Sequence, residues 1–267
     1  MKQYLSFFRI RFTAGLQYRA AALAGIATQF AWGFLLLFRF AAFYRTNPEA
    51  APMEYSQLAS YIWLQQAFLT LFSAWSLDSE VLNAITSGSI AYEMVRPVNL
   101  YAQWFVKNVA TRLSKALLRC VPVLVVSLLL PRPYRLSLPD TPLALCFFLA
   151  TGLLGLMAVV AYTMLIYGFT FFTMNPQGLR LIMVSVTDLL TGALIPLPFL
   201  PDSVRWAMER TPFAMIMNLP LRVYSGHIAG GELAEFFLWQ VFWLAALVGV
   251  GLAIFRKAQK KVVVQGG

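Results

Sequence analysis

The sequence predicts an all-α membrane protein with six transmembrane helices. Of its 267 residues, 60% are hydrophobic and 12% are charged, about half of the charged fraction that is usual in soluble domains. The mean hydropathy is +0.68. Uncharged stretches of about 20 residues, the length that crosses a bilayer, recur along the chain. Six such spans leave little sequence for a soluble domain, so we expect residues 1–267 to form a single transmembrane domain.

The first nineteen residues mix bases with large apolar side chains. Lys2, Arg9, Arg11 and Arg19 are interspersed with aromatic and aliphatic residues. This mixture is typical of an interfacial helix, whose bases contact lipid headgroups while its aromatic side chains lie below them. We therefore expect an interfacial helix here, with a plain basic tail as the alternative.

Apolar stretches with few or no charges set the expected spans. These are residues 20–44, 57–76, 108–130, 143–173, 181–199 and 236–255. The third must reach back to Asn108 to be long enough, which places Arg112, Lys115 and Arg119 near one face of its first turns. We expect these three bases to line the membrane surface or a subunit contact.

A proline-rich stretch follows the fifth span. Five prolines lie between Pro196 and Pro220, interleaved with apolar residues. The stretch is too apolar for a free loop and too rich in helix breakers for a span. Short re-entrant helices packed against protein would satisfy backbone groups that lipid cannot. We expect such helices on the outer side, before the sixth span.

A polar-containing stretch, residues 77–97, separates the second and third spans. Leu77, Val81 and Ile85 recur at the spacing of one helical face, and Leu82 lies beside them. This pattern predicts a short amphipathic helix. A bare linker needs no such stripe, so we interpret the stretch as a surface that contacts another protein.

Local signals set the ends of this helix. Asp78 and Glu80 fall in its first turn, where the helix dipole favours negative charge. Gly88 suits the left-handed conformation that ends a helix, and Pro97 makes the preceding Arg96 extended.

The distribution of bases predicts the orientation. Fourteen lysines and arginines fall in the N-terminal stretch, in residues 77–119, in the 174–180 turn and in the C-terminal tail, whereas six fall in the opposite loops. Because cytoplasmic segments are rich in bases, both termini and residues 77–97 should be cytoplasmic. Topology also accounts for much of the net charge of +10, so a nucleic-acid partner is not expected.

The chemistry of an enzyme is absent from the sequence. No phosphate-binding loop occurs, no cluster of ligands suits a metal, and no catalytic residue is expected. Cys120 and Cys146 lie in apolar surroundings, and His227 is most simply a solvated loop residue. Asp188 is an acid inside an expected span, which makes it either part of a substrate path or a structural residue.

Two stretches resemble a known family. Residues 85–97, Ile-Thr-Ser-Gly-Ser-Ile-Ala-Tyr-Glu-Met-Val-Arg-Pro, are similar to the I-x-x-G-x-I-x-x-x-L-x-R-P signature of ABC-2 permeases, with Met94 and Val95 where leucine is usual. Residues 192–201 together with 211–213 are similar to the proline-rich outer segment of that family.

The resemblance implies a subunit of a bacterial exporter in the cytoplasmic (inner) membrane. Two six-helix permeases, identical or related, would enclose the substrate path, and two separate ATPase chains would bind ATP and Mg, so that this chain needs no cofactor. The amphipathic helix of residues 77–97 would be the coupling helix, whose apolar stripe enters a cleft of the ATPase. The contact residues would then be Leu77, Val81, Leu82, Ile85, Gly88, Ile90, Arg96 and Pro97.

Two other classes of membrane protein remain open from the sequence. A secondary transporter or channel usually shows internal repeats or several charges within its spans. A scaffold that transports nothing would lack an ATPase partner.

Overall fold

The computed structural model describes residues 2–139 and 141–260, and all regular structure within them is helical. Four helices are long: α2 (Arg19–Thr46), α7 (Leu100–Leu129), α8 (Pro142–Thr173) and α12 (Gly230–Gln259). The shorter ones are α1 (Lys2–Gly15), η1 (Pro48–Ala50), α3 (Tyr55–Ala67), α4 (Leu69–Phe72), α5 (Ser79–Thr86), α6 (Ala91–Met94), α9 (Pro176–Leu190), η2 (Leu197–Phe199), α10 (Asp202–Glu209) and α11 (Asn218–Tyr224).

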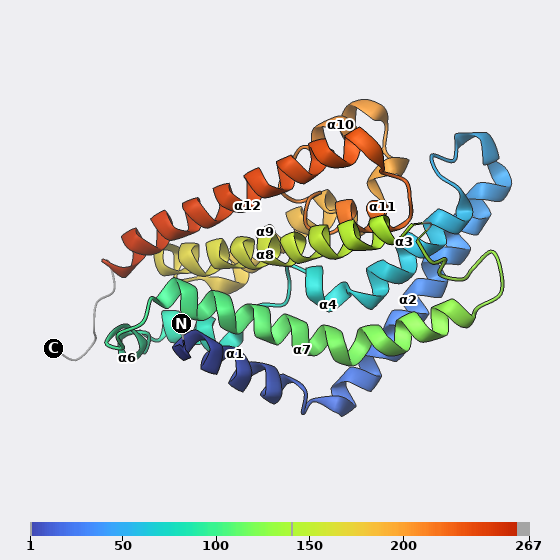
Figure 1. The fold of residues 1–267 in the computed structure, drawn as a ribbon. Coiled ribbons are helices and arrows are strands. Elements are labelled where there is room, and N and C mark those ends of the chain that lie inside the picture. The colour runs from blue at the N-terminus through green and yellow to red at the C-terminus, as the bar shows by residue number, and fades with distance from the viewer. Residues whose placement is uncertain (1, 140, 261–267) are drawn as a thin grey trace.

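The helices form an elongated bundle with α8 at its centre. Helices α7, α8 and α12 lie side by side, α2 packs beside α3 and α7, and α1 lies along the first half of α7 (Figure 1). In the described chain, α2, α8 and α12 are long and apolar enough to cross a membrane. Large apolar side chains are exposed on all four long helices and on α9, which suits contact with lipid.

Two ends of the bundle are distinct. The start of α1, helices α5 and α6, the turn between α8 and α9 and the C-terminal end of α12 share one end (Figure 1). The other end holds α10, residues 47–54 and residues 131–139 (Figure 1). The elements that the base count placed on one side of the membrane therefore lie together.

Polar side chains cap the first turns of α7, α8 and α9. Asn99 and Thr141 cap α7 and α8 by accepting hydrogen bonds from backbone N–H groups of the first turn. Asn175 caps α9 in the same way. Pro142 and Pro176 stand directly after their caps, where a missing N–H costs nothing.

Three of the expected spans differ in form from the helices found. The second is interrupted at Phe68, where α3 ends and α4 begins, and the chain is extended from Ser73. The third belongs to α7, which begins at Leu100 and so carries its bases well inside the helix. The fifth corresponds to α9, which is shorter than the roughly 20 residues of a complete crossing.

The first part of the broken second span is deeply buried in the bundle. Ten consecutive residues of α3 are buried, from Leu58 to Ala67. Its polar groups bond across the core: the amide of Gln65 donates to the carbonyl of Ala193 at 2.7 Å, and the indole of Trp63 donates to the carbonyl of Tyr134 at 2.7 Å. Helix α3 therefore packs against protein on all sides rather than against lipid.

The proline-rich stretch folds as short helices at the end opposite α5. All seven residues of α11 are buried, and α11 packs against α8 and α3. Its Arg222 forms a buried salt bridge with Glu209 of α10 and approaches Glu232 of α12 to 4.0 Å. Helices α10 and α11 are thereby attached to the bundle.

Candidate functional site

Residues 77–97 fold as two short helices joined by a tight turn. Helix α5 begins after Asp78, whose side chain accepts a hydrogen bond from the backbone N–H of Glu80 at 2.9 Å. The helix stops where Gly88 takes a positive φ of 75°. This is the left-handed stop expected from the sequence. Ile90 then folds back, and its N–H donates to the carbonyl of Ala84 at 3.0 Å.

The apolar stripe of this segment faces the chain's own core, which differs from the expectation that it enters a partner. Ile85 is only 3% exposed. Together with Val81, Leu82 and Ile90 it packs against residues of α7, α8 and α12. These neighbours are Leu100, Tyr101, Trp104, Met164, Tyr167 and Phe255. An amphipathic stripe indicates a buried face but not what covers it. In the structure Val81, Leu82, Ile85 and Ile90 contact their own chain, rather than a partner.

Polar contacts fix the segment from two sides. On one side, the backbone N–H of Asp78 donates to the hydroxyl of Tyr167 in α8 at 2.7 Å, and Trp104 of α7 donates to Glu93 at 2.8 Å. On the other side, Arg11 of α1 forms ion pairs with Asp78, at 3.5 Å, and with Glu80. Burial lowers the pKa of Arg11, whereas the carboxylates of Glu80 and Asp78 raise it, and the net effect is a raised pKa. Residues 77–97 are therefore attached to α1, α7 and α8.

The opposite face of the segment is open. Tyr92 is 78% exposed and Val95 is 83% exposed. Asn83, Arg96 and Pro97 are exposed beside them, whereas Leu77 and Gly88 are partly buried. Exposed apolar side chains next to polar ones are typical of protein contact sites. Most of these exposed residues belong to the sequence motif of residues 85–97. The helical periodicity instead predicted the apolar stripe as the contact surface.

A buried arginine lies directly beneath the segment. Arg112 of α7 is 1% exposed, although the sequence suggested a base at the membrane surface or at a subunit contact. Its guanidinium donates to the carbonyls of Leu71 and Ser73, at 3.1 and 2.6 Å, and to Asn108 and Thr163, at 2.7 and 3.1 Å. The break after α4 leaves carbonyls without helical partners, and Arg112 binds them.

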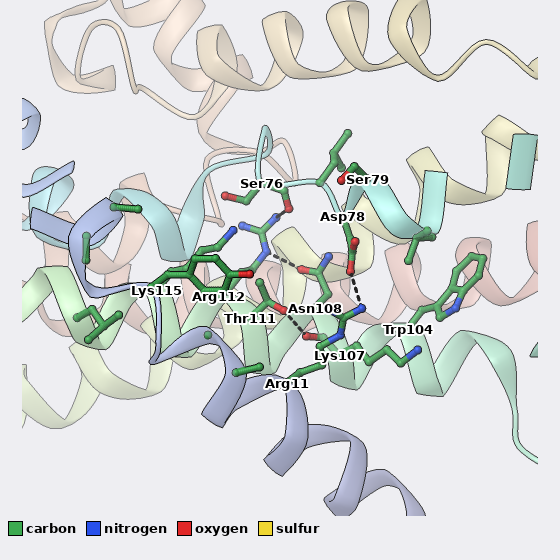
Figure 2. A pocket seen from close by; sticks show the side chains of 18 of the residues that line it. Arg11, Ser76, Asp78, Ser79, Trp104, Lys107, Asn108, Thr111, Arg112 and Lys115 are labelled. Atoms are coloured by element: carbon green, nitrogen blue, oxygen red, sulfur yellow. Dashed lines mark hydrogen bonds and ion pairs between the residues drawn. The ribbon is translucent and has the colours of Figure 1, made fainter. Parts of the chain in front are cut away.

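A cavity of about 470 Å³ opens beside this arginine. It lies between α1, the start of α2, α7 and residues 76–81 (Figure 2). Five bases contribute to its lining and one acid, Asp78, faces them. The bases are Arg11, Lys107, Arg112, Lys115 and Arg119. The cavity is therefore strongly positive.

The other residues singled out by the sequence lie away from this region. Asp188 is partly buried in α9, and no hydrogen bond or salt bridge engages its carboxylate within the described chain. Arg39 donates to the carbonyl of Leu194 at 3.1 Å rather than to Asp188. His227 is half-buried rather than solvated; burial, with Arg222 and Arg205 nearby, lowers its pKa to about 4.

Comparison with known families agrees with the motif. Residues 30–266 match the family model described as ABC-2 family transporter protein. No curated protein sequence gives a significant match. Members of this family are membrane components of ABC transporters and generally associate with ATPase partners. The match spans most of a chain with several apolar helices, so this multi-pass membrane protein belongs to the ABC-2 transporter family.

Proposed function

We propose that this chain is the permease subunit of an ATP-driven exporter and that residues 77–97 are the site where a separate ATPase docks. The observation that carries the proposal is the construction of the segment. Its apolar stripe and its polar contacts anchor it to α1, α7 and α8, while Tyr92 and Val95 remain exposed. A rigidly held surface of this kind suits transmission of movement from a partner.

The contacts of the segment offer a route into the bundle. A displacement of α5 would reach α8 through Asp78 and Tyr167, and a displacement of α6 would reach α7 through Glu93 and Trp104. Helix α8 continues to the outer helices, where it packs against α11. The ATPase would supply ATP binding and Mg binding, and this chain would supply the mechanical connection.

The proposed orientation places the α5 end in the cytoplasm of a bacterium, with the chain in the inner membrane. The end that holds α5 and α6 also contains most of the bases, which favours the cytoplasmic side. Both termini would then be cytoplasmic, and α10 and α11 would cover the outer exit. In this arrangement α2, α8 and α12 would each cross the membrane. Three more crossings would be made by α3 together with α4, by α7, and by α9 together with the chain after it.

A second permease, identical or related, would complete the substrate path. The outward face of α9 exposes Leu181, Ile182, Val186 and Leu189, which need lipid or protein beside them. Asp188 on the same helix has no partner within the described chain, which supports a position along that path. On this proposal Asp188→Asn lowers transport without loss of the ATPase.

The docking proposal is tested by purification from a mild detergent. Val95→Asp places a charge on the most exposed of the large apolar side chains of the segment, and an unpaired charge in a desolvated contact costs at least about 3 kcal/mol, roughly a hundredfold in affinity. We expect this variant to lose the ATPase that accompanies the unsubstituted chain. Val204→Asp makes the same change on an exposed position of α10, at the other end.

The outcomes separate the functional classes. Loss of the ATPase from Val95→Asp but not from Val204→Asp supports docking at residues 77–97. An unsubstituted chain that never carries an ATPase contradicts the exporter proposal and favours a secondary transporter, a channel or a scaffold. An ATPase that remains on Val95→Asp contradicts the docking site alone.

A further inference from the structure

The cavity beside α5 has more positive charge than its own carboxylates balance. Arg11 is paired with Asp78 and Glu80, and Lys107 lies 3.9 Å from Glu93. The three remaining bases of the lining have no carboxylate within salt-bridge distance in the described chain. These are Arg112, Lys115 and Arg119.

The charge of Arg112 cannot be moved to solvent. Its donors are committed to the neutral oxygens of residues 71, 73, 108 and 163, which fix the guanidinium in the cavity wall. Neutral acceptors satisfy hydrogen bonds but do not cancel a charge, and a buried charge without a counter-ion is costly. An anion in the cavity would reduce this cost.

Two further bases line the same cavity and could bind an anion together with Arg112. Lys115 and Arg119 follow Arg112 at intervals of three and four residues, so all three share one face of α7. No hydrogen bond or salt bridge occupies the Lys115 amine within the described chain, and Arg119 donates only to the carbonyl of Ala21 at 3.4 Å. Their remaining donors are available to a ligand.

Glycines keep the walls close to these bases. A Cβ atom at Gly25 of α2 would collide with the guanidinium of Arg119, and one at Gly15 of α1 would collide with Ser114 of α7. The close approach of α1 to α7 therefore depends on the absence of a side chain at Gly15, whereas the flexible guanidinium of Arg119 could move away from a Cβ atom at position 25.

The surroundings favour a lipid over a free ion. The cavity adjoins the junction of α1 and α2, where Tyr18 and Leu23 are exposed, and Ala14, Ala22 and Leu118 add apolar surface to its lining. Its volume of about 470 Å³ is roughly 15 times that of one water in the liquid, far more than a bare phosphate needs. Basic pockets at the membrane surface typically hold lipid headgroups.

We propose that this cavity binds the phosphate headgroup of an anionic phospholipid. The phosphate lies against Lys115, Arg119 and the charge of Arg112, and the acyl chains leave between α1 and α2 past the exposed apolar side chains. A bound lipid would then stabilise the packing of α1 against α7, directly beside residues 77–97. The proposal requires the chain to be in a membrane but does not depend on the ATPase.

The test uses the purified full-length chain in phosphatidylcholine nanodiscs with and without phosphatidylglycerol. We expect phosphatidylglycerol to raise the unfolding temperature, and native mass spectrometry to show it retained. Lys115→Gln and Arg119→Gln should each weaken retention about tenfold, the effect of about 1.4 kcal/mol. Lys257→Gln is the matched control, because Lys257 is an exposed base near the same end of the bundle, on α12.

Each alternative result identifies another occupant. If inorganic phosphate in phosphatidylcholine nanodiscs raises the unfolding temperature as much as phosphatidylglycerol does, the ligand is a free anion and the lipid proposal is wrong. Equal weakening by Lys257→Gln overturns the site, because surface charge alone would then explain binding. If phosphatidylglycerol has no effect and Lys115→Gln loses the ATPase, the lipid proposal is also wrong. The cavity would then receive an acidic side chain of the partner. Arg112 is left unchanged because it holds residues 71–73.

Discussion

Two buried arginines stabilise this chain in different ways. Arg222, at the α10 end, is neutralised by Glu209 and has Glu232 close by. Arg112, at the α5 end, bonds to carbonyl, amide and hydroxyl oxygens and has no carboxylate partner in the described chain. The first arrangement is a buried ion pair that joins two helices, whereas the second leaves a net charge beside a cavity. The α5 end therefore has unbalanced positive charge beside a cavity, whereas the buried charge of Arg222 is balanced.

At the residue scale, Glu209→Ala should destabilise the protein strongly. The substitution leaves Arg222 buried and unpaired, and loss of one partner of a buried pair costs about 3 kcal/mol or more. Glu232 offsets part of this cost. The unfolding temperature in detergent measures the effect. Asp202→Ala is the control, since Asp202 forms an exposed pair with Arg205 that contributes little. Similar unfolding temperatures for both variants would contradict a structural role for the buried pair.

At the scale of one helix, the contact between α8 and the outer chain depends on Gly155. A Cβ atom there would overlap the carbonyl oxygen of Ile216, which precedes α11. Gly152, almost one turn earlier, has open space around its Cβ position. The same substitution at these two positions therefore separates packing from helix propensity.

We expect Gly155→Ala to destabilise the protein by about 1–3 kcal/mol, because a backbone carbonyl cannot yield as a flexible side chain does. Gly152→Ala should be neutral or more stable by up to about 1 kcal/mol, since alanine favours a helix. Thermal unfolding in the same detergent compares the two variants. A loss of stability for Gly152→Ala as large as that for Gly155→Ala would contradict the packing described here.

The same scale shows what the sequence could predict about residues 77–97. The short helix, the negative charges at its start and its stop at Gly88 follow from local signals and agree with the structure, whereas the capping hydrogen bond of Asp78 was not predicted. The direction of the stripe did not follow, because Val81 and Ile85 have the same periodicity whether their own bundle or a partner covers them. A charge at Ile85 would therefore disrupt the segment itself, and the exposed Val95 is the better probe of docking.

Long-range pairing limited the prediction elsewhere. The break between α3 and α4 and the end of α4 lie in an uncharged stretch, and nothing local marks them. The carbonyls at the end of α4 are bound by Arg112 of another helix. Hydropathy alone therefore suggested an unbroken second span and placed Arg112 at the membrane surface or a subunit contact. The cavity likewise combines α1, α2 and α7, and only the bases on α7 were visible as a group in the sequence.

At the scale of the whole molecule, the two ends of the bundle should face opposite sides of the membrane. We expect a cysteine at Ser87 to be labelled by an impermeant thiol reagent only from the cytoplasmic side. A cysteine at Asn47 should be labelled only from outside. Both positions are exposed at opposite ends of the bundle. Cys120 and Cys146 are replaced by serine first, and labelling of Ser87→Cys from outside would reverse the proposed orientation.

The central claim, that residues 77–97 dock an ATPase, is tested most directly by cross-linking in the membrane. A photoreactive phenylalanine analogue replaces Tyr92 on the exposed face or, as control, Trp206, which is exposed on α10 at the other end. The account predicts a cross-linked product with an ATP-binding chain from position 92 and none from position 206. No such product from position 92, or an equal amount from position 206, would contradict it.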